Sequence, residues 1–260
     1  MNKIDQLFSN NPEGLLNIFF TAGYPKLESA PLIAQALENS GVKLIEIGMP
    51  YSDPLADGET IQESSQMALK NGMNLDQMFE QVSLISETTD LTIILMGYFN
   101  QLMTVGVESF LGRCHNAGVA GLIIPDLPLD IFEKDYKNLF DRYEMAISFL
   151  ITPRTSTERI IQADKLSSGF LYMVADNSIT GGDSSEFSEA QLNYFRRIKA
   201  MKLRSNVLIG FGIKSNRQFS ITKEYTNGSI IGSEFIRRLP KDGDGLKEVI
   251  EDFVSGIYKG

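Results

Sequence analysis

The clearest pattern along the 260 residues is a series of short, almost wholly apolar runs, each separated from the next by a longer segment of mixed polarity. The runs are rich in β-branched and aliphatic residues and are short enough to be strands. Near-continuous apolar runs are typical of parallel strands that are covered on both faces. The pattern predicts eight such strands, at Asn17–Thr21, Lys43–Gly48, Leu91–Met96, Ala120–Ile124, Met145–Leu150, Phe170–Val174, Asn206–Gly210 and Gly228–Ile231.

The segments between the runs repeat apolar residues at the spacing of amphipathic helices, as in Val107–Cys114 and Leu246–Ile257. Strands that alternate with helices along a whole chain imply consecutive parallel βα units, and eight units in about 250 residues are typical of a closed barrel. An open doubly wound sheet is the alternative, but no Gly-x-Gly-x-x-Gly motif follows the first strand. We therefore expect an α/β fold in which residues 1–260 form a single-domain (β/α)₈ TIM barrel.

Two further helical segments would be additions to the eight repeats. A short N-terminal helix at Ile4–Phe8 would cap the bottom of the barrel, and Leu75–Ser86 would be an extra helix after the second βα unit. No linker, low-complexity tract or block of like charges divides the chain into smaller domains.

Charge and rare residues narrow the classes of function. A net charge of −9 argues against nucleic acid or an anionic membrane as a partner, so an anionic substrate must be held locally by backbone amides or a helix terminus. The N-terminus has no signal-peptide core, no apolar run approaches the length of a membrane span, and the lone Cys114 cannot form an intrachain disulfide. The single histidine, His115, argues against histidine metal clusters and Ser-His-Asp triads. We expect a cytoplasmic protein without a metal.

The second predicted strand carries one carboxylate among apolar residues. Alternation along the strand places Leu44, Glu46 and Gly48 on one face, so Glu46 points into the barrel mouth. Burial disfavours the charged carboxylate and raises its pKa, which suits a general acid near neutral pH. The alternative is a structural glutamate paired with a buried lysine or arginine from another strand.

The loop after this strand contains two prolines and two aspartates, Asp53 and Asp57. Taken alone, each aspartate could simply cap a turn or the next helix. The longer segment is more specific. Residues 44–58 read Leu-Ile-Glu-Ile-Gly-Met-Pro-Tyr-Ser-Asp-Pro-Leu-Ala-Asp-Gly, which resembles the signature segment of the tryptophan synthase α subunit family. Other segments agree in order over nearly the whole chain, among them Phe19–Pro25, Met96–Asn100, Ile124–Pro128, Gly210–Ile213 and Gly232–Ser233.

The resemblance implies a reaction and its catalytic residues. Members of the family cleave indole-3-glycerol phosphate to indole and glyceraldehyde 3-phosphate by a retro-aldol reaction in tryptophan biosynthesis. Glu46 matches the catalytic glutamate, a general acid and base, and Asp57 matches the second catalytic carboxylate, which stabilises positive charge on the indole nitrogen. No metal or organic cofactor is expected in this chain.

The family also implies how the substrate is held. Backbone N–H groups at Gly181, Gly212, Gly232 and Ser233 would bind the phosphate, because glycine lets the backbone approach closely and Ser233 would open a short helix at Glu234–Leu239. Any one of these glycines could instead be an ordinary turn residue. An apolar slot would hold the rest of the substrate, although each of its aromatic residues could equally belong to the barrel core. These aromatic residues are Phe19, Tyr98, Tyr172 and Phe211.

A β subunit is the partner that the resemblance implies. In this family the α subunit forms an α2β2 heterotetramer, and pyridoxal phosphate belongs to the β partner. Asp53, and Asp126 after the fourth strand, are expected at that interface. A closing loop after the sixth strand is also expected, in which Thr180 bonds Asp57.

Three positions depart from the family pattern. Asp176 and Ser178 stand in the closing loop where many members carry arginine and glycine, and Glu59 replaces a common proline. The network of the closing loop is therefore expected to differ. Three alternative functions stay open: a free-standing lyase for the same substrate, a non-catalytic regulatory barrel subunit, and another phosphate-binding barrel enzyme, although intact Glu46 and Asp57 argue against the second.

Overall fold

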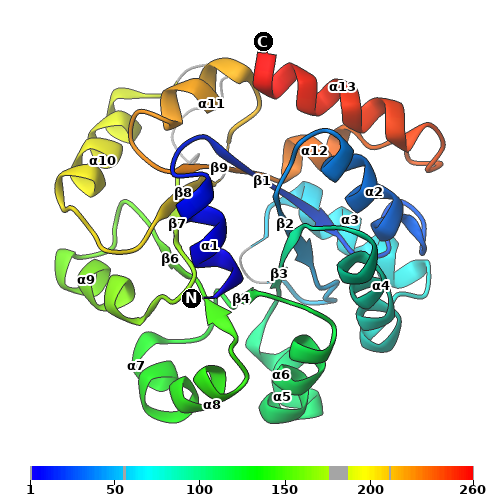
Figure 1. Ribbon diagram of the computed structural model, residues 1–260, viewed down its shortest axis with the longest axis horizontal. Helices are drawn as coiled ribbons and strands as arrows, with labels where there is room; N and C mark the ends of the chain where they lie inside the picture. Colours follow the sequence, from blue (N-terminus) through cyan, green and yellow to red (C-terminus); the bar gives the residue numbers. More distant parts are fainter. Residues whose placement is uncertain (1, 55–56, 176–186, 211, 260) are drawn as a thin grey trace.

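A ring of parallel strands, surrounded by helices, forms the centre of the computed structural model (Figure 1), which describes residues 2–54, 57–175, 187–210 and 212–259. The predicted alternation of strands and helices is confirmed. The strands are β1 Leu15–Thr21, β2 Leu44–Gly48, β3 Thr92–Met96, β4 Gly121–Ile123, β5 Ala146–Ile147, β6 Phe149–Ile151, β7 Leu171–Val174, β8 Val207–Gly210 and β9 Gly228–Ile231.

The strand order shows how the ring closes. Neighbours run β5-β4-β3-β2-β1-β9-β8-β7-β6, and every pair is parallel. The two ends of this series, β5 and β6, are consecutive in the chain and are separated by Ser148 alone. The structure is therefore the predicted eight-unit barrel with its fifth strand divided in two.

Ser148 explains why the predicted strand Met145–Leu150 is not continuous. Its backbone N–H donates to Leu122 O at 3.0 Å, on the β4 side. Its side-chain hydroxyl accepts from the N–H of Phe170 at 3.0 Å, on the β7 side. One residue thus bonds both neighbours, and the ladder passes from β5 to β6 at this point. The sequence pattern does not reveal this break, because the run is apolar on both sides.

Helices cover the outside of the ring, as amphipathic segments between parallel strands should. Among the described residues, none of the helices is long and apolar enough to cross a membrane. They are α1 Lys3–Asn10, α2 Ser29–Asn39, α3 Glu59–Lys70, α4 Leu75–Thr88, α5 Phe99–Val105, α6 Val107–Asn116, α7 Leu129–Ile131, the π-helix η1 Phe132–Tyr136, α8 Lys137–Arg142, α9 Thr157–Leu166, α10 Glu189–Ala200, α11 Asn216–Thr222, α12 Ser233–Arg238 and α13 Leu246–Lys259.

The N-terminal helix α1 covers the end of the barrel where the strands begin, as predicted, and Figure 1 shows it across the centre of the ring. The Asn2 side chain caps the helix by accepting from the N–H of Asp5 at 2.8 Å. Ile4 is fully buried, and the ring of Phe8 lies edge-on to Phe170 with centroids 6.2 Å apart. An apolar plug therefore closes the bottom and leaves the opposite end for chemistry.

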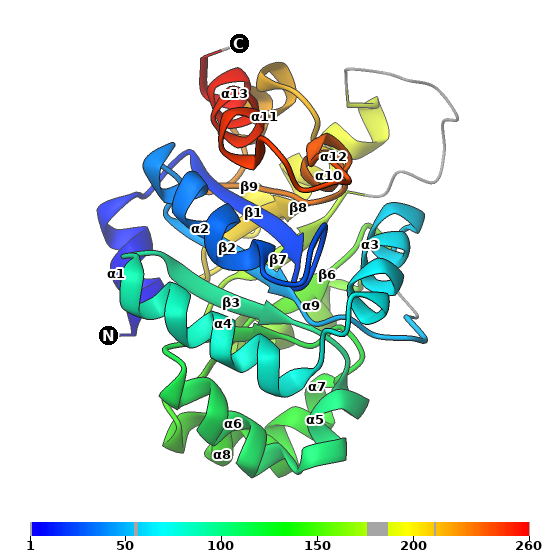
Figure 2. The same ribbon diagram turned by 90° about the vertical axis from the view of Figure 1, so that its right-hand side faces the viewer.

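The helix predicted at Leu75–Ser86 exists as α4, but its place in the fold is a correction. It packs between α2 and α6 and thus fills the ordinary covering position of the second unit. The additional helix is α3, which packs against α12 and β1 at the end of the barrel where the strands finish (Figure 2). Helical spacing identifies a helix but cannot say which of two consecutive helices covers the sheet.

We predict that Ile4→Ala lowers the free energy of unfolding by about 2–5 kcal/mol, because it leaves a cavity in the closed bottom of the barrel. Leu32→Ala removes a side chain of similar size that is 64% exposed on α2, and it should change stability by less than about 0.5 kcal/mol. Urea denaturation of both variants measures the difference. Equal stabilities would show that α1 does not hold the bottom closed.

Candidate active site

A cavity of about 850 Å³ lies at the end of the barrel where the strands finish, which is where barrel enzymes carry their active sites. Residues predicted from the sequence as catalytic, aromatic and phosphate-binding line the same space. They are Phe19, Glu46, Asp57, Tyr172, Gly212, Gly232 and Ser233. The structure thus brings together side chains from β1, β2, β7 and the loops that follow β2, β8 and β9.

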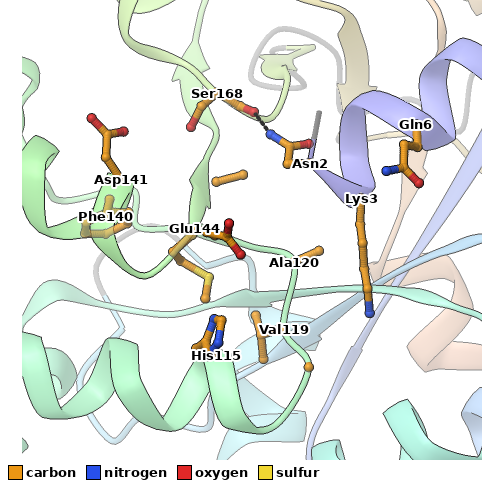
Figure 3. Close-up of a pocket in the computed structure, with 13 residues that line it drawn as sticks. Asn2, Lys3, Gln6, His115, Val119, Ala120, Phe140, Asp141, Glu144 and Ser168 are labelled. Atoms are coloured by element: carbon orange, nitrogen blue, oxygen red, sulfur yellow. Dashed lines mark hydrogen bonds between the residues drawn. The ribbon is translucent and has the colours of Figure 1, made fainter.

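A second cavity, of about 500 Å³, lies at the opposite end of the barrel, beside α1 (Figure 3). His115 lines it together with Lys3 and Glu144, and Asn2 donates to Ser168 O across one edge at 2.9 Å. His115 and Glu144 are both exposed. The charged side chains of this cavity are exposed, whereas the cavity at the other end contains the fully buried Glu46, so the latter is the candidate active site.

Glu46 is the most unusual residue of the site, because its carboxyl group has no exposed surface. Oxygen Oε2 accepts from Nδ2 of Asn17 at 3.1 Å, whereas Oε1 has no hydrogen-bond partner among the described residues. Burial raises the pKa of Glu46 to about 8; the Asn17 bond opposes this and the charge of Asp57 adds to it. No lysine or arginine neutralises the group, so the structural alternative of a buried ion pair is wrong for the described residues.

Asp57 lies at the mouth of the cavity, in the loop that joins β2 to α3. Burial raises the pKa of its carboxyl group, and a hydrogen bond from the side chain of Tyr98 lowers it. The backbone carbonyl of Asp57 accepts from Gln62 Nε2 at 2.8 Å, which ties the loop to α3. The N-cap of α3 is Gly58, so Asp57 lies one residue before this cap. It faces Glu46 and the space between them.

Two aromatic rings form walls around Glu46. Phe19 lies opposite Glu46 in the strand register, and its ring crosses Gly48 so closely that a Cβ there would overlap it. The hydroxyl of Tyr172 lies over Gly210 in the same way. Burial, with the charges of Glu46 and Asp57, raises the pKa of Tyr172 well above its ordinary value, so its hydroxyl stays protonated.

Gly48 and Gly210 are site residues for which the sequence predicts no role. Their signal is visible in retrospect, since each glycine ends a predicted apolar strand. The sequence does not show, however, which rings occupy the space beside these glycines, because the rings come from neighbouring strands. Tyr98, which is predicted to line the slot, lies beside the main cavity. Its side chain bonds Asp57, which lines that cavity, and the centroid of its ring lies 5.3 Å from that of Tyr51.

Three of the four residues predicted to bind phosphate, Gly212, Gly232 and Ser233, line the cavity beside the start of α12. Gly232 is the N-cap of α12, Ser233 is its first residue, and Gly212 adopts a φ of 79° that favours glycine. Three basic side chains that were not predicted, Lys214, Arg237 and Arg238, line the same part of the cavity. Arg237 and Arg238 both pair with Glu234, so the three cations outnumber this carboxylate and leave local positive charge in an acidic chain. Thr180, Gly181 and Phe211 lie outside the described residues, as do Asp176 and Ser178.

Arg237 also connects this end of the cavity to the loop of Asp57. Its Nη1 donates to the Thr60 hydroxyl at 3.2 Å, in the first turn of α3, and its Nη2 pairs with Glu234 at 2.8 Å. Glu59, one of the three residues that depart from the family pattern, is the exposed first residue of α3. A carboxylate in the first turn of a helix is favourable, so the substitution is compatible with this helix start.

Asp53 and Asp126, predicted at a partner interface, are both exposed and lie outside the cavity. The side chain of Ser52 donates to Asp53. Asp126 Oδ1 accepts from the N–H of Phe99 at 2.8 Å and so caps the start of α5. The described residues contain no group of three histidine, cysteine or acidic side chains arranged to hold a metal ion.

The chain is similar to known proteins of one family along almost its whole length. The family model for the tryptophan synthase alpha chain matches residues 6–256. The alpha chain of Flavobacterium psychrophilum is 48% identical over 258 residues, which cover 99% of this chain and 100% of the relative. The alpha chain of Christiangramia forsetii is 48% identical over 243 residues, or 94% of each chain.

Solved structures give the same result. Tryptophan synthase subunit alpha from Legionella pneumophila superposes with a TM-score of 0.88 at 26% identity, and the match covers 100% of this chain and 98% of that one. A chain of the tryptophan synthase α2β2 complex from Pyrococcus furiosus superposes with a TM-score of 0.85 at 32% identity, over 94% of this chain and 98% of that one.

We predict that the difference in the free energy of unfolding between Glu46→Gln and wild type depends on pH. Between the ordinary pKa of 4.5 and the folded value of about 8, the folded state binds more protons at Glu46 than the unfolded state does. The contribution of Glu46 to the free energy of unfolding is therefore fully present below the ordinary pKa of 4.5, and it is lost as pH rises through the folded pKa of about 8. The variant lacks this loss, so its stability relative to wild type should rise by up to about 1.4 kcal/mol per pH unit in that range and then level off.

Urea denaturation at a series of pH values measures this difference. Glu80→Gln makes the same chemical change at an exposed position of α4 and should run parallel to wild type. A Glu46→Gln curve that also ran parallel to wild type would show that the carboxyl group titrates normally.

Proposed function

Since the chain belongs to the tryptophan synthase α chain family, we propose that it is a lyase that cleaves indole-3-glycerol phosphate to indole and glyceraldehyde 3-phosphate. One observation carries the proposal. Glu46, a fully buried carboxyl group with a pKa of about 8, faces Asp57 in a cavity that ends at the start of α12. The residues supply two proton-handling groups with different surroundings and a place for an anionic ester.

Glu46 is the proposed general acid and base. Near neutral pH its raised pKa keeps it protonated, so it can give a proton to C3 of the indole ring and convert the ring to an electron-accepting indolenine. The carboxylate left behind then takes the proton of the side-chain hydroxyl. The O–H electrons form the aldehyde carbonyl, the C–C bond breaks, and its electrons return to the ring. Donor and acceptor are the same group, so the carboxyl group ends protonated.

Asp57 is the proposed electrostatic partner. It would accept the indole N–H and oppose the positive charge that develops on the nitrogen when C3 is protonated. Its bond from Tyr98 favours the ionised form that this role requires. Phe19 and Tyr172 would hold the indole ring between Glu46 and Asp57.

The phosphate would lie at the other end of the cavity. Gly212, Gly232 and Ser233 offer backbone N–H groups there, together with Gly181 outside the described residues, and the basic side chains of Lys214 and Arg237 line the same space. This local charge supports binding of a phosphate ester by a chain with a net charge of −9. Each chemical step above uses side chains of the chain itself, so we propose that it works without a cofactor.

We also propose a β subunit as partner, in an α2β2 complex, with pyridoxal phosphate held by that partner. The solved α2β2 complex of the Pyrococcus furiosus relative supports this, at 32% identity over 94% of this chain. Exposed Asp53 and Asp126 are the proposed contact residues, and Thr180 is the proposed contact of Asp57 in a closed loop. We place the protein in the cytoplasm and treat residues 1–260 as one domain, in keeping with a biosynthetic enzyme of this family.

We predict that the purified chain releases indole from indole-3-glycerol phosphate and that Glu46→Gln lowers kcat by about 10²–10⁴-fold, the usual contribution of a general acid or base. Asp57→Asn should also lower kcat, because it removes the negative charge. Indole release measures both. Glycerol 3-phosphate should still raise the Tm of each variant, since the phosphate site is intact.

The matched control is Glu80→Gln, on the outer surface of α4, which should keep wild-type kcat. If wild type releases no indole although glycerol 3-phosphate raises its Tm, the substrate is wrong and only a phosphate site remains. If Glu46→Gln retains full kcat, its proposed role is wrong.

We predict that adding a β subunit raises kcat at least about tenfold, a coupling within the usual range for interacting sites, and that Asp53→Lys weakens this activation by placing a cation in the contact surface. Glu87→Lys reverses the same charge near the end of α4, away from the mouth of the cavity, and should have no effect. Titration of indole release with β subunit measures both. A fast wild type that ignores the β subunit would instead identify a free-standing lyase.

A further inference from the structure

An asparagine inside the barrel has a position that packing alone does not favour. All seven residues of β1 are buried, and the Asn17 side chain has no exposed surface. Alternation places Asn17 on the same face of β1 as Phe19, which lines the cavity. Branched apolar side chains dominate such barrel interiors, so an amide here needs a specific partner.

The partner of this amide is the candidate general acid. Asn17 Nδ2 donates to Glu46 Oε2 at 3.1 Å, across a separation of 29 residues. The other amide atom, Oδ1, is buried and has no hydrogen-bond partner among the described residues, and the same holds for Glu46 Oε1. Unpartnered buried oxygens lower stability and are uncommon, so the pair is better explained by chemistry than by folding.

We propose that Asn17 is a positioning residue for Glu46, one that holds Oε2 and leaves Oε1 as the oxygen that exchanges a proton with the substrate. The inference rests on the proposed function for the identity of the substrate. It goes further by assigning different tasks to the two carboxyl oxygens and by adding a residue to which the family resemblance gives no role.

An amide suits this task because it can serve both protonation states of the carboxyl group. Asn17 Nδ2 donates to Oε2, as the structure shows, and an ionised Glu46 accepts this bond. When Oε1 carries the proton, Oε2 is the carbonyl oxygen of the neutral carboxyl group and still accepts from Nδ2. A hydrophobic residue could do neither, and a lysine would hold the carboxylate ionised. Asn17 can therefore keep Glu46 in one orientation while the proton leaves and returns.

Two other titratable groups act on Glu46 across the site. Asp57, from the loop after β2, raises its pKa by charge repulsion, and Tyr172, from β7, lies within electrostatic reach of both carboxyl groups. Asn17, from β1, is the side chain whose hydrogen bond lowers the pKa of Glu46. Removing the Asn17 donor should therefore move the titration of Glu46 to higher pH and leave Asp57 and Tyr172 in place.

The test compares Asn17→Leu, which keeps a similar volume without the amide, with Ser229→Ala. The control removes a different buried bond of the barrel wall, between the hydroxyls of Ser229 and Thr222. Titration of Glu46 is followed by NMR of the ¹³C-labelled glutamate carboxyl groups, with its signal assigned from Glu46→Gln. This measurement uses the full chain without substrate, so it does not depend on the proposed reaction.

We expect Asn17→Leu to raise the midpoint of the Glu46 titration by about one pH unit, a tenfold lower acid dissociation constant. Ser229→Ala should leave it unchanged. In indole release, Asn17→Leu should lower kcat by at least about tenfold with little change in KM, and the kcat–pH profile should move up with the Glu46 midpoint. If Asn17→Leu does not fold, the smaller Asn17→Val also removes the donor without adding a second carboxyl group, and it should also move the midpoint upward.

An unchanged midpoint in a folded Asn17 variant would overturn the proposal, as would a fall in kcat matched by Ser229→Ala. A raised midpoint in a chain that releases no indole would support the Asn17–Glu46 pair and reject the substrate instead. The two failures are therefore distinguishable.

Discussion

The candidate active site depends on keeping one carboxyl group out of water inside the barrel. Glu46 has no exposed surface and no cationic partner among the described residues, so its charged form is disfavoured and its pKa rises to about 8. That single fact turns an ordinary side chain into a proton donor at neutral pH. Phe19 and Tyr172 line the cavity around Glu46 and maintain its burial. Asn17 moderates the rise in the pKa of Glu46 through its hydrogen bond.

The walls that maintain this burial are built by pairing large rings with missing side chains. The ring of Phe19 occupies the space of a Cβ at Gly48, and the hydroxyl of Tyr172 occupies that space at Gly210. Each ring and its glycine lie on neighbouring strands of a parallel ladder, where the spacing between strands leaves no room for both a ring and a second side chain. The aromatic side chains can therefore lie flat around the carboxyl group and still leave a cavity.

The two ends of the barrel have opposite tasks. At the end where the strands begin, α1 closes the barrel by burying Ile4 and Phe8. The apolar core is thereby sealed at this end, and the opposite end can remain open as a cavity. There α3 and α12 pack together over the mouth, and Arg237 bonds Thr60 between them. The link joins the proposed phosphate site to the loop of Asp57, so the two halves of the substrate would be bound by connected elements.

Much of this follows from local pattern. Apolar runs alternating with amphipathic segments determine parallel strands connected by helices, because only strands covered on both faces can be apolar throughout, and eight repeats favour closure into a barrel. Alternation alone points Glu46 inward, and the segment 44–58 identifies the family. Tertiary structure decided what no local pattern encodes. The break at Ser148, the place of α3 over the mouth, and the bonds from Asn17 to Glu46 and from Tyr98 to Asp57 are such features. Each joins residues from different strands or units, and their meeting depends on the register and closure of the whole ring.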